Sequence, residues 1–367
     1  MAHDASIPSA DGITKGFPTL TSKRPRDSCG ARHLFSASWW KSPVILATVV
    51  AQEFLPGLLA ATSHKPKRHP LSPPTRQRRR LPLSSRRPIT PRGRRQRPYI
   101  ANTPCWIITL QPNSDDVDLL LSAGKMQRLH INTIEGIDGR SGIPELEDNE
   151  HIANNVTRWR HLCELKSSEI GCYLAHLRAI RRAYRSGLDR VCILEDDVQL
   201  EPSFGRVLAE LEQLPENIEM IRLMGLKVRK RKVVQTLNDG VHQLVRPERG
   251  WCGAQGYLIN RRGMEKILKY ANRIFEPIDK VFDHFWQFDL KLYGVEPHLL
   301  WENEHISNIV KSNIHRTKVA RWLYWLHPFG KLWRSVGRHF YLRLHSKEFY
   351  PAEKPTQRTG RTARIKS

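Results

Sequence analysis

The stretch that decides the fold is Val191-Cys192-Ile193-Leu194-Glu195-Asp196-Asp197. Its first four residues are apolar, which predicts a short strand that is buried on both faces of a sheet. Three acids follow at the point where this strand ends. Ligands of open α/β sheets bind beyond the carboxyl ends of the strands, so we expect these acids to lie at a ligand site.

Strands and helices alternate on both sides of this central strand. We expect further strands at 105–110, 130–134 and 220–223, and helices at 117–129, 170–186 and 204–214. The 170–186 helix follows Ser167 and Ser168, either of which can cap it, and Glu169 lies in its first turn, where the helix dipole favours a carboxylate. Residues 140–166 are polar and irregular. The alternation predicts an α/β fold, with a mainly parallel sheet flanked by helices.

The positive charge of the chain is confined to its two ends. The net charge is +24, yet residues 104–310 hold 27 Lys and Arg against 30 Asp and Glu. Residues 1–103 and 311–367 carry the excess, with net charges of +15 and +12. We therefore expect a disordered, basic, Arg- and Pro-rich extension over 1–103, a folded domain over 104–310 and a basic amphipathic tail over 311–367.

The basic extension leaves a second class of function open. Its Arg-rich runs between residues 64 and 98 are able to bind nucleic acid, and they are equally typical of a solvated tail without a partner. The apolar stretch at 43–61 has Gln52 and Glu53 at its centre, which disfavours a membrane span. A nucleic-acid-binding protein is therefore one alternative, although no specific nucleic acid is expected.

The six cysteines indicate neither a zinc module nor a disulfide framework. They show no paired spacing, and several lie in apolar runs such as the one around Cys192. This pattern fits a reducing compartment, so we expect a cytoplasmic protein.

The three acids after the central strand are suited to holding a cation. Glu195 and Asp197 are one residue apart and can offer oxygen ligands to Mg²⁺ or Mn²⁺, while a nucleotide diphosphate supplies other ligands. The metal would then stabilise charge on the departing diphosphate. A solvated acidic turn is the alternative interpretation of the same residues.

The neighbourhood of these acids resembles glycosyltransferase family 25, which includes lipooligosaccharide and collagen galactosyltransferases. The matching pieces are Glu169-Ile170-Gly171-Cys172-Tyr173-Leu174-Ala175-His176-Leu177, Ile193–Val198, Ile137-Asp138-Gly139, Gly253–Ile259 and Pro277-Ile278-Asp279. They occur in the family's order over about 200 residues. Two departures are Ala175, where the family usually has serine, and Gln111–Asp116, where it usually has an arginine-bearing segment.

The resemblance implies a GT-A-like fold, a UDP-sugar donor (usually UDP-galactose), a divalent cation and inverting transfer to a saccharide. By position, Glu195 and Asp197 look like the metal ligands. The remaining matched residues are Glu169, Gly171, His176, Asp196 and Asp138 on the donor side, and Gly253 and Tyr257 on the acceptor side. Plainer roles fit several of them equally well, such as a helix-capping acid or a core histidine. The departures also leave a non-catalytic member of the fold open.

Inverting transfer needs a base that accepts the proton of the acceptor hydroxyl. Asp279 and Asp283 are four residues apart, which places them on one helix face beside Phe285 and Trp286. We expect Asp279 to be the base and Asp283 to be the second candidate. A helix cap after Pro277 is the alternative role for Asp279.

The basic tail contains an amphipathic segment at 321–344. Trp322, Trp325, Phe329, Trp333 and Phe340 lie on one helical stripe, accompanied by Lys and Arg, and Pro328 with Gly330 predicts a split into two short helices. This composition is typical of a helix at an anionic membrane surface. It agrees with a lipid-linked oligosaccharide acceptor, such as a lipopolysaccharide core, at the inner face of the plasma membrane. A helix packed on the domain is the alternative.

Overall fold

The computed structural model describes residues 100–302 and 319–355. The predictions for residues 1–99 of the basic leader, including the apolar stretch at 43–61, lie outside the described residues, as does the proposed boundary at 310. Ala101 and Thr103 are buried, so the ordered domain begins before the expected residue 104. Within the described ranges, no helix combines the length and the apolar character that a membrane span requires.

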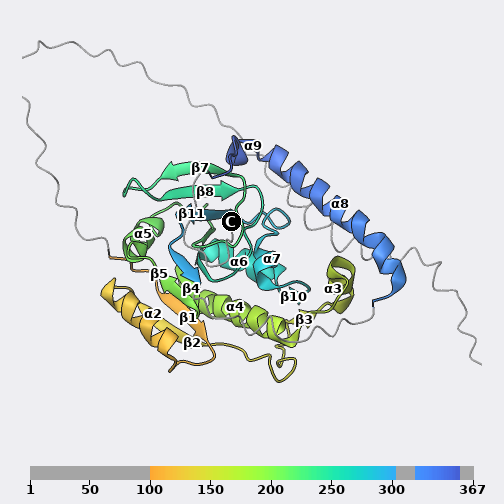
Figure 1. The fold of residues 1–367 in the computed structure, drawn as a ribbon, viewed down its shortest axis with the longest axis horizontal. Coiled ribbons are helices and arrows are strands. Elements are labelled where there is room, and N and C mark those ends of the chain that lie inside the picture. Colours follow the sequence, from red (N-terminus) through yellow and green to blue (C-terminus); the bar gives the residue numbers. More distant parts are fainter. Residues whose placement is uncertain (1–99, 303–318, 356–367) are drawn as a thin grey trace, which may run out of the picture. The chain divides into compact units, whose positions relative to one another are not determined.

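An eight-stranded sheet forms the centre of the domain (Figure 1), in the order β2-β1-β4-β9-β6-β11-β8-β7. The strands are β1 (Cys105–Thr109), β2 (Ile131–Glu135), β4 (Arg190–Glu195), β6 (Met220–Arg222), β7 (Arg231–Thr236), β8 (Gln243–Pro247), β9 (Gly256–Asn260) and β11 (Leu292–Glu296). Strands β8 and β9 run antiparallel to their neighbours, and the other six share one direction. The expected α/β fold with a mainly parallel sheet is therefore confirmed.

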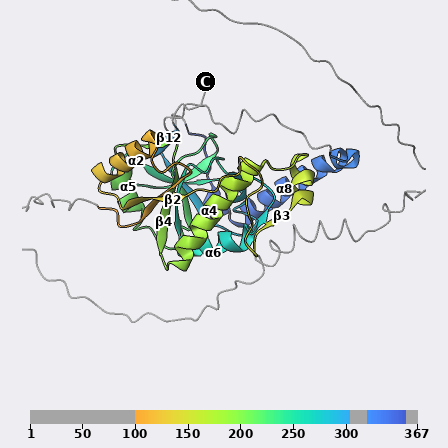
Figure 2. The ribbon, with the colours of Figure 1, turned by 90° about the horizontal axis from the view of Figure 1, so that it is seen from below.

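Helices cover both faces of this sheet. They are α2 (Asp115–Met126), α4 (Ser167–Arg185), α5 (Phe204–Leu211), α6 (Arg261–Tyr270) and α7 (Ile278–Phe282). Along β4, Cys192 and Leu194 join one core cluster while Val191 and Ile193 join the other. The cluster with Cys192 and Leu194 lies under α2 and α5, and the cluster with Val191 and Ile193 lies under α4, α6 and α7. Figure 2 shows α2 and α5 on one side of the sheet and α4 and α6 on the other. The central strand is thus buried on both faces, as its apolar run predicts.

Helix starts differ from the expected ones in two places. Helix α2 begins at Asp115 rather than 117, because the Ser114 side chain accepts from the Val117 N–H at 3.4 Å. Helix α4 is capped by neither serine. Its N-cap is Lys166, whose N–H donates to Glu169 Oε2 at 2.8 Å.

The segment expected to be irregular contains a helix, α3 (Asn154–His161), and a short strand, β3 (His151–Ile152). Strand β3 pairs with β10 (Arg273–Ile274). A buried ion pair between Arg160 and Glu276, 2.7 Å long, ties α3 to the residues before α7. Its partner is more than a hundred residues away in the chain, so local sequence does not reveal this helix.

The C-terminal segment forms helix α8 (Arg321–Leu344) and the short helix α9 (Ser346–Phe349). The predicted split at Pro328 is wrong, because α8 is continuous through this residue. Pro328 removes the hydrogen-bond donor for the Tyr324 carbonyl. Both residues lie on the exposed side of the helix, where water can replace that donor.

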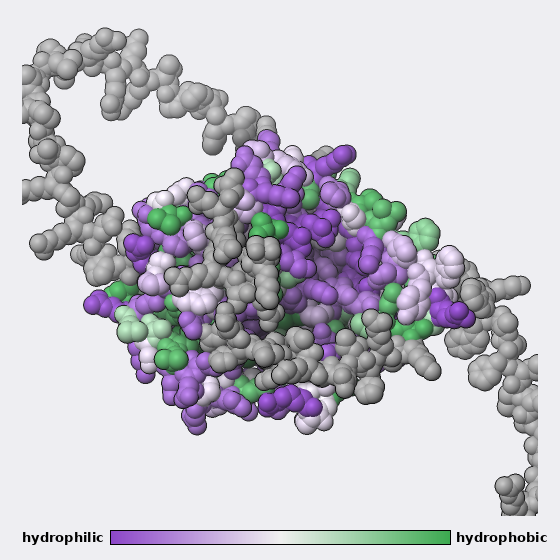
Figure 3. All heavy atoms as spheres, in the orientation of Figure 1, coloured by the Kyte–Doolittle hydropathy of each residue, from purple (hydrophilic) through white to green (hydrophobic). Residues whose placement is uncertain are grey.

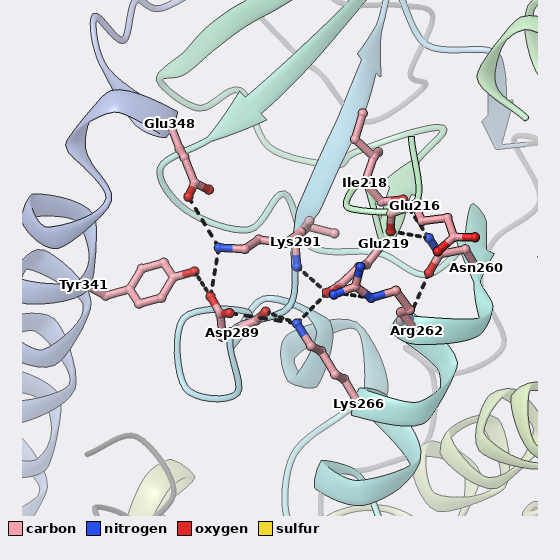
Figure 4. A network of polar contacts seen from close by, with 12 residues as sticks. Glu216, Ile218, Glu219, Asn260, Arg262, Lys266, Asp289, Lys291, Tyr341 and Glu348 are labelled. Carbon is pink, nitrogen blue, oxygen red and sulfur yellow. Dashed lines mark hydrogen bonds and ion pairs between the residues drawn. The ribbon is translucent and has the colours of Figure 1, made fainter. Parts of the chain in front are cut away.

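Helices α8 and α9 are fastened to the domain by a polar network (Figure 4). The Tyr341 hydroxyl donates to Asp289 Oδ1 at 2.6 Å, and Lys291 bridges Asp289 and Glu348 at 3.0 and 3.4 Å. Phe349 is fully buried in the core cluster beneath α4 and α6. The tail is therefore packed on the domain along one of its faces.

Glu219 is the buried carboxylate at the centre of the same network. Its Oε2 atom accepts from Lys266 Nζ at 2.8 Å and from the Lys291 N–H at 2.9 Å, and its side chain is 1% exposed. Because Lys266 also donates to the Asp289 carbonyl at 2.6 Å, Glu219 links α6 to the loop that receives Tyr341 of α8.

We expect Glu219→Gln to lower the free energy of unfolding by about 2 kcal/mol, because it leaves Lys266 without its buried counter-charge. Urea denaturation measures this change. Glu265→Gln is the matched control, since its ion pair with Lys269 is exposed and its loss should cost less than about 0.5 kcal/mol. Equal effects of the two substitutions would contradict the structural role of Glu219.

Candidate active site

Polar residues gather at the edge of the sheet where the parallel strands end. Thr109 is the last residue of β1, Glu195 of β4 and Arg222 of β6, while Gln255 comes just before the antiparallel β9. Because these strands share one direction, their carboxyl ends meet at the same edge. The position predicted for the acidic triplet is the one observed.

A hydrogen-bonded chain orients Glu195. His176 from α4 lies between two partners, with Nδ1 3.0 Å from the Tyr257 hydroxyl and Nε2 3.2 Å from Glu195 Oε1. The ring and the tyrosine are both fully buried. A neutral imidazole that donates from Nε2 and accepts at Nδ1 satisfies both contacts. His176 therefore positions the carboxylate, and Tyr257 positions His176.

The other two acids of the triplet lie in the turn between β4 and β5 (Val198–Leu200). Asp196 is half-buried and takes a hydrogen bond from the Thr109 side chain. Asp197 is the exposed member of the triplet. Desolvation of its carboxylate by the surrounding protein, followed by the charges of Glu195, Glu302 and Asp196, raises its pKa to about 7. Mutual repulsion of carboxylates is therefore a property of this site.

The fourth carboxylate of the group, Glu302, was not predicted. It lies on β12 (Leu300–Glu302), which pairs with β5 so that Glu302 is opposite Val198, next to Asp197. Gln255 Nε2 donates to Glu302 Oε1 at 2.6 Å. Gln255 Oε1 is buried and has no hydrogen-bond partner among the described residues. No local signal marks Glu302, because a pairing across about 100 residues brings it to the site.

The two candidate bases face one loop. The Gly253 N–H donates to Asp279 Oδ2 at 3.0 Å, and the Cys252 N–H donates to Asp283 Oδ2 at 3.1 Å. The φ angle of Gly253 is +78°, and a Cβ there would lie 2.1 Å from Gln255 Oε1. The two aspartates thus face the same loop, although the expected shared helix face is not formed, because α7 ends at Phe282. Gly253 is required by the backbone itself.

The two aspartates differ in their surroundings. Asp283 lies just after the end of α7. Its Oδ1 atom is buried, lies 3.8 Å from Arg222 Nη1 and has no hydrogen-bond partner within the described part of the chain. Burial raises the pKa of Asp283 to about 6, against the attraction of Arg222 and with a further contribution from Asp279. Asp279 is half-buried, and both of its neighbours in the chain, Ile278 and Lys280, belong to α7.

Cys172 connects the two halves of the site. Burial raises the pKa of its thiol well above the usual range, and the charges of Glu195, Asp279, Asp197 and Glu169 raise it further. Charges from the acidic triplet and from the candidate base therefore act on one buried atom. The acids of the β4 edge and those of the α7 segment contribute to one region of negative charge around this thiol.

Two donor sets are available to a cation. Ligand atoms of Cys172, His176 and Glu195 lie within 4.8 Å of one another. The thiol, however, has a strongly raised pKa, and the histidine already has two partners. The carboxylates around Asp197 supply oxygen atoms and unbalanced negative charge, which suit Mg²⁺ or Mn²⁺. By donor chemistry, the residues at the β4 edge suit the expected cation better than the cysteine group does, whereas the short distances between ligand atoms belong to the cysteine group.

The remaining predicted donor residues shape the start of α4. A Cβ on Gly171 would lie 2.6 Å from the Ile137 carbonyl oxygen, so glycine allows the 137–139 loop to contact the helix. Asp138 in this loop is exposed and pairs with Arg140 at 2.8 Å, which lowers the pKa of Asp138 to about 2. Glu169 caps the helix, as described above. Contact of these residues with a donor stays a prediction.

Comparison with known proteins agrees with this geometry. Residues 102–282 match the model of glycosyltransferase family 25 (LPS biosynthesis protein). Procollagen galactosyltransferase 1 of Danio rerio is 27% identical over 219 residues, covering 54% of this chain and 36% of that protein. The lacto-N-neotetraose biosynthesis glycosyltransferase LgtE of Neisseria meningitidis serogroup B is 28% identical over 214 residues, covering 53% of this chain and 75% of that protein.

A third relative is described as inactive. The inactive glycosyltransferase 25 family member 3 of Homo sapiens is 31% identical over 153 residues, covering 36% of this chain and 25% of that protein. The chain spans about a third of the length of the procollagen galactosyltransferases that it matches. The matched segment of this chain belongs to glycosyltransferase family 25.

We expect Asp283 to make stability depend on pH. Its folded pKa of about 6 exceeds the ordinary 3.8, so the folded protein keeps a proton that the unfolded chain loses first. Stability from this group therefore falls as the pH rises from about 4 to about 6. Asp283→Asn removes this loss, so its free energy of unfolding relative to the wild type should rise by about 2 to 3 kcal/mol between pH 4 and pH 7.

Urea unfolding at a series of pH values measures the difference. The pH-independent offset from the altered contact with Arg222 does not affect the slope. Asp118→Asn, at an exposed site on α2, is the control and should run parallel to the wild type. Parallel curves for Asp283→Asn and the wild type would contradict the raised pKa.

Proposed function

We propose that this protein is an inverting glycosyltransferase that moves a sugar from a UDP-sugar to a saccharide acceptor. The observation that carries the proposal is the group of carboxylates Glu195, Asp196, Asp197 and Glu302 at the carboxyl edge of the sheet. Such a group is costly unless a cation balances it. The family match over the same residues supports a nucleotide-sugar donor as the source of the diphosphate.

In this proposal, Glu195 and Asp197 hold a divalent cation. When bound, the cation neutralises negative charge on the leaving diphosphate. His176 keeps the Glu195 carboxylate in place, and Thr109 does the same for Asp196. The protein therefore offers oxygen ligands that are held in position before the donor arrives.

Asp279 is proposed as the base. The acceptor hydroxyl gives its proton to the Asp279 carboxylate while its oxygen forms a bond to the anomeric carbon. The bond from that carbon to the diphosphate breaks on the opposite face, and UDP leaves. The contact with Gly253 occupies one carboxylate oxygen and fixes the orientation of the group. Gly253 and the buried Tyr257 would then shape the acceptor side, with Asp283 as the second candidate base.

The relatives suggest which sugar and acceptor to test first. One relative is named procollagen galactosyltransferase, and another is named lacto-N-neotetraose biosynthesis glycosyltransferase. The family description refers to LPS biosynthesis. We therefore propose galactose as the donor sugar and a lipopolysaccharide or lipooligosaccharide core, linked to lipid, as the acceptor. The proposed location is the inner face of the plasma membrane.

A non-catalytic role is the second candidate, favoured by the inactive human relative and by Ala175 in place of the usual serine. The two candidates differ in one respect. A non-catalytic member keeps the folded sheet, whereas an enzyme must also turn over a donor. A screen of UDP-sugars by thermal shift with Mn²⁺, followed by transfer assays with the best donor, separates them.

We expect Asp279→Asn to leave donor binding unchanged and to lower transfer about 10²- to 10⁴-fold, because it removes only the proton acceptor. Thermal shift with UDP-sugar and Mn²⁺ measures binding, and release of UDP in the presence of acceptor measures transfer. Asp118→Asn is the control and should match the wild type in both. Near-normal transfer by Asp279→Asn would rule out its role as base.

A further inference from the structure

Helix α8 has two unlike long faces. One face packs on the domain, and the opposite face presents large apolar side chains to solvent. Their exposed fractions run from 48% to 80%. The residues of this exposed stripe are Trp322, Trp325, Phe329, Leu332, Trp333, Val336, Phe340 and Leu344. Their spacing of three, four and seven residues places them along one side of an α-helix.

Two glycines allow the packed face of α8 to approach the domain closely. A Cβ on Gly330 would lie 2.7 Å from the Trp159 ring, and one on Gly337 would lie 2.9 Å from the Trp286 ring. His327 adds a contact of 3.0 Å between its Nδ1 atom and the Trp159 carbonyl. Glycines seven residues apart share a helix face. The domain thus contacts the small-residue side of α8, and the aromatic side is left outward.

The orientation of α8 is fixed at its far end as well. Tyr341 donates to Asp289, and Leu342 is buried in the core cluster that also contains Phe349. Rotating α8 about its axis to bury the exposed stripe would break these contacts. It would also replace the two glycines by large side chains at Trp159 and Trp286, which would clash. The stripe is therefore exposed because these contacts fix the orientation of α8 on the domain.

The positive charge of α8 favours a negatively charged binding partner for the stripe. The helix contains five Lys and Arg and no Asp or Glu, and Arg321, Lys331 and Arg343 are exposed beside the stripe. Two copies of such a helix would repel each other. An anionic lipid surface offers both the negative charge for the basic residues and an apolar layer for the aromatic ones. Hydrophobic side chains appear along the edge of the molecule that α8 follows (Figure 3).

We infer that the exposed stripe of α8 is a docking surface for an anionic membrane, which it enters with its aromatic side chains. Basic residues beside the stripe contact lipid headgroups. The inference goes beyond the proposed catalysis and depends on no step of it, because docking requires neither donor nor acceptor. For a transferase with a lipid-linked acceptor, the docked helix would hold the domain at the surface where that acceptor lies.

Vesicle flotation of the full chain tests the inference. The vesicles contain phosphatidylcholine alone or with about one third phosphatidylglycerol. Salt at about 0.15 M and about 0.5 M separates apolar insertion from purely electrostatic binding, including any binding through the basic leader. We expect the wild type to prefer the anionic vesicles and to keep part of its binding at the higher salt.

The decisive variant is Trp325→Ser/Phe329→Ser/Phe340→Ser. We expect it to bind anionic vesicles at least tenfold more weakly at both salt concentrations, which corresponds to about 1.4 kcal/mol. Met126→Ser/Leu119→Ser/Val241→Ser is the matched control, because these apolar residues are equally exposed elsewhere on the domain. The control should bind as the wild type does. Unchanged thermal unfolding and unchanged far-UV circular dichroism would show that both variants are folded.

Three results would overturn the inference. The first is equal vesicle binding by the stripe variant and the wild type. The second is equal loss in the stripe variant and the control. The third is a wild-type dimer in light scattering that the stripe variant converts to a monomer without any vesicle binding, which would assign the stripe to a second copy of the chain. Failure of transfer activity would leave this test unaffected.

Discussion

Repulsion among carboxylates is the constraint on which the site depends. Glu195, Asp196, Asp197 and Glu302 come from two separate parts of the chain. Burial raises the pKa of Asp197 to about 7, and the charges of Glu195, Glu302 and Asp196 add to this rise. A fold does not keep such a group for stability, because each added charge makes the others more costly. In the proposed function, a bound cation would balance these charges.

The rest of the domain serves to hold these acids in place. The central strand β4 is buried on both faces, so the position of Glu195 at its end is rigid. His176 connects that carboxylate to Tyr257 on the neighbouring strand β9. On the other side, the loop at Gly253 is held by Asp279, which brings a candidate base to the same region of negative charge. Helix α8 is packed outside this arrangement, and its aromatic stripe is exposed.

Features with a local cause could be predicted from the sequence, and features made by distant contacts could not. The apolar run before Glu195 and the acids after it are neighbours in the chain, so both the strand and its place at the sheet edge were predicted. Glu302 reaches the site only through pairing of β12 with β5. Helix α3 has no side-chain cap and is held by the distant pair Arg160–Glu276, so it was missed. The continuity of α8 through Pro328 depends on which side of the helix faces water, which only packing decides.

Electron paramagnetic resonance of Mn²⁺ tests the cation site most directly, because the signal of the free ion disappears on binding. In the presence of UDP, the full chain should remove this signal in proportion to its concentration, and Asp197→Ala should abolish the effect. Glu302→Gln should weaken it about tenfold, since one negative charge is lost near the ion. A free-ion signal that wild type and Asp197→Ala leave equally unchanged would show that these acids do not hold a cation, and would contradict the account of the site.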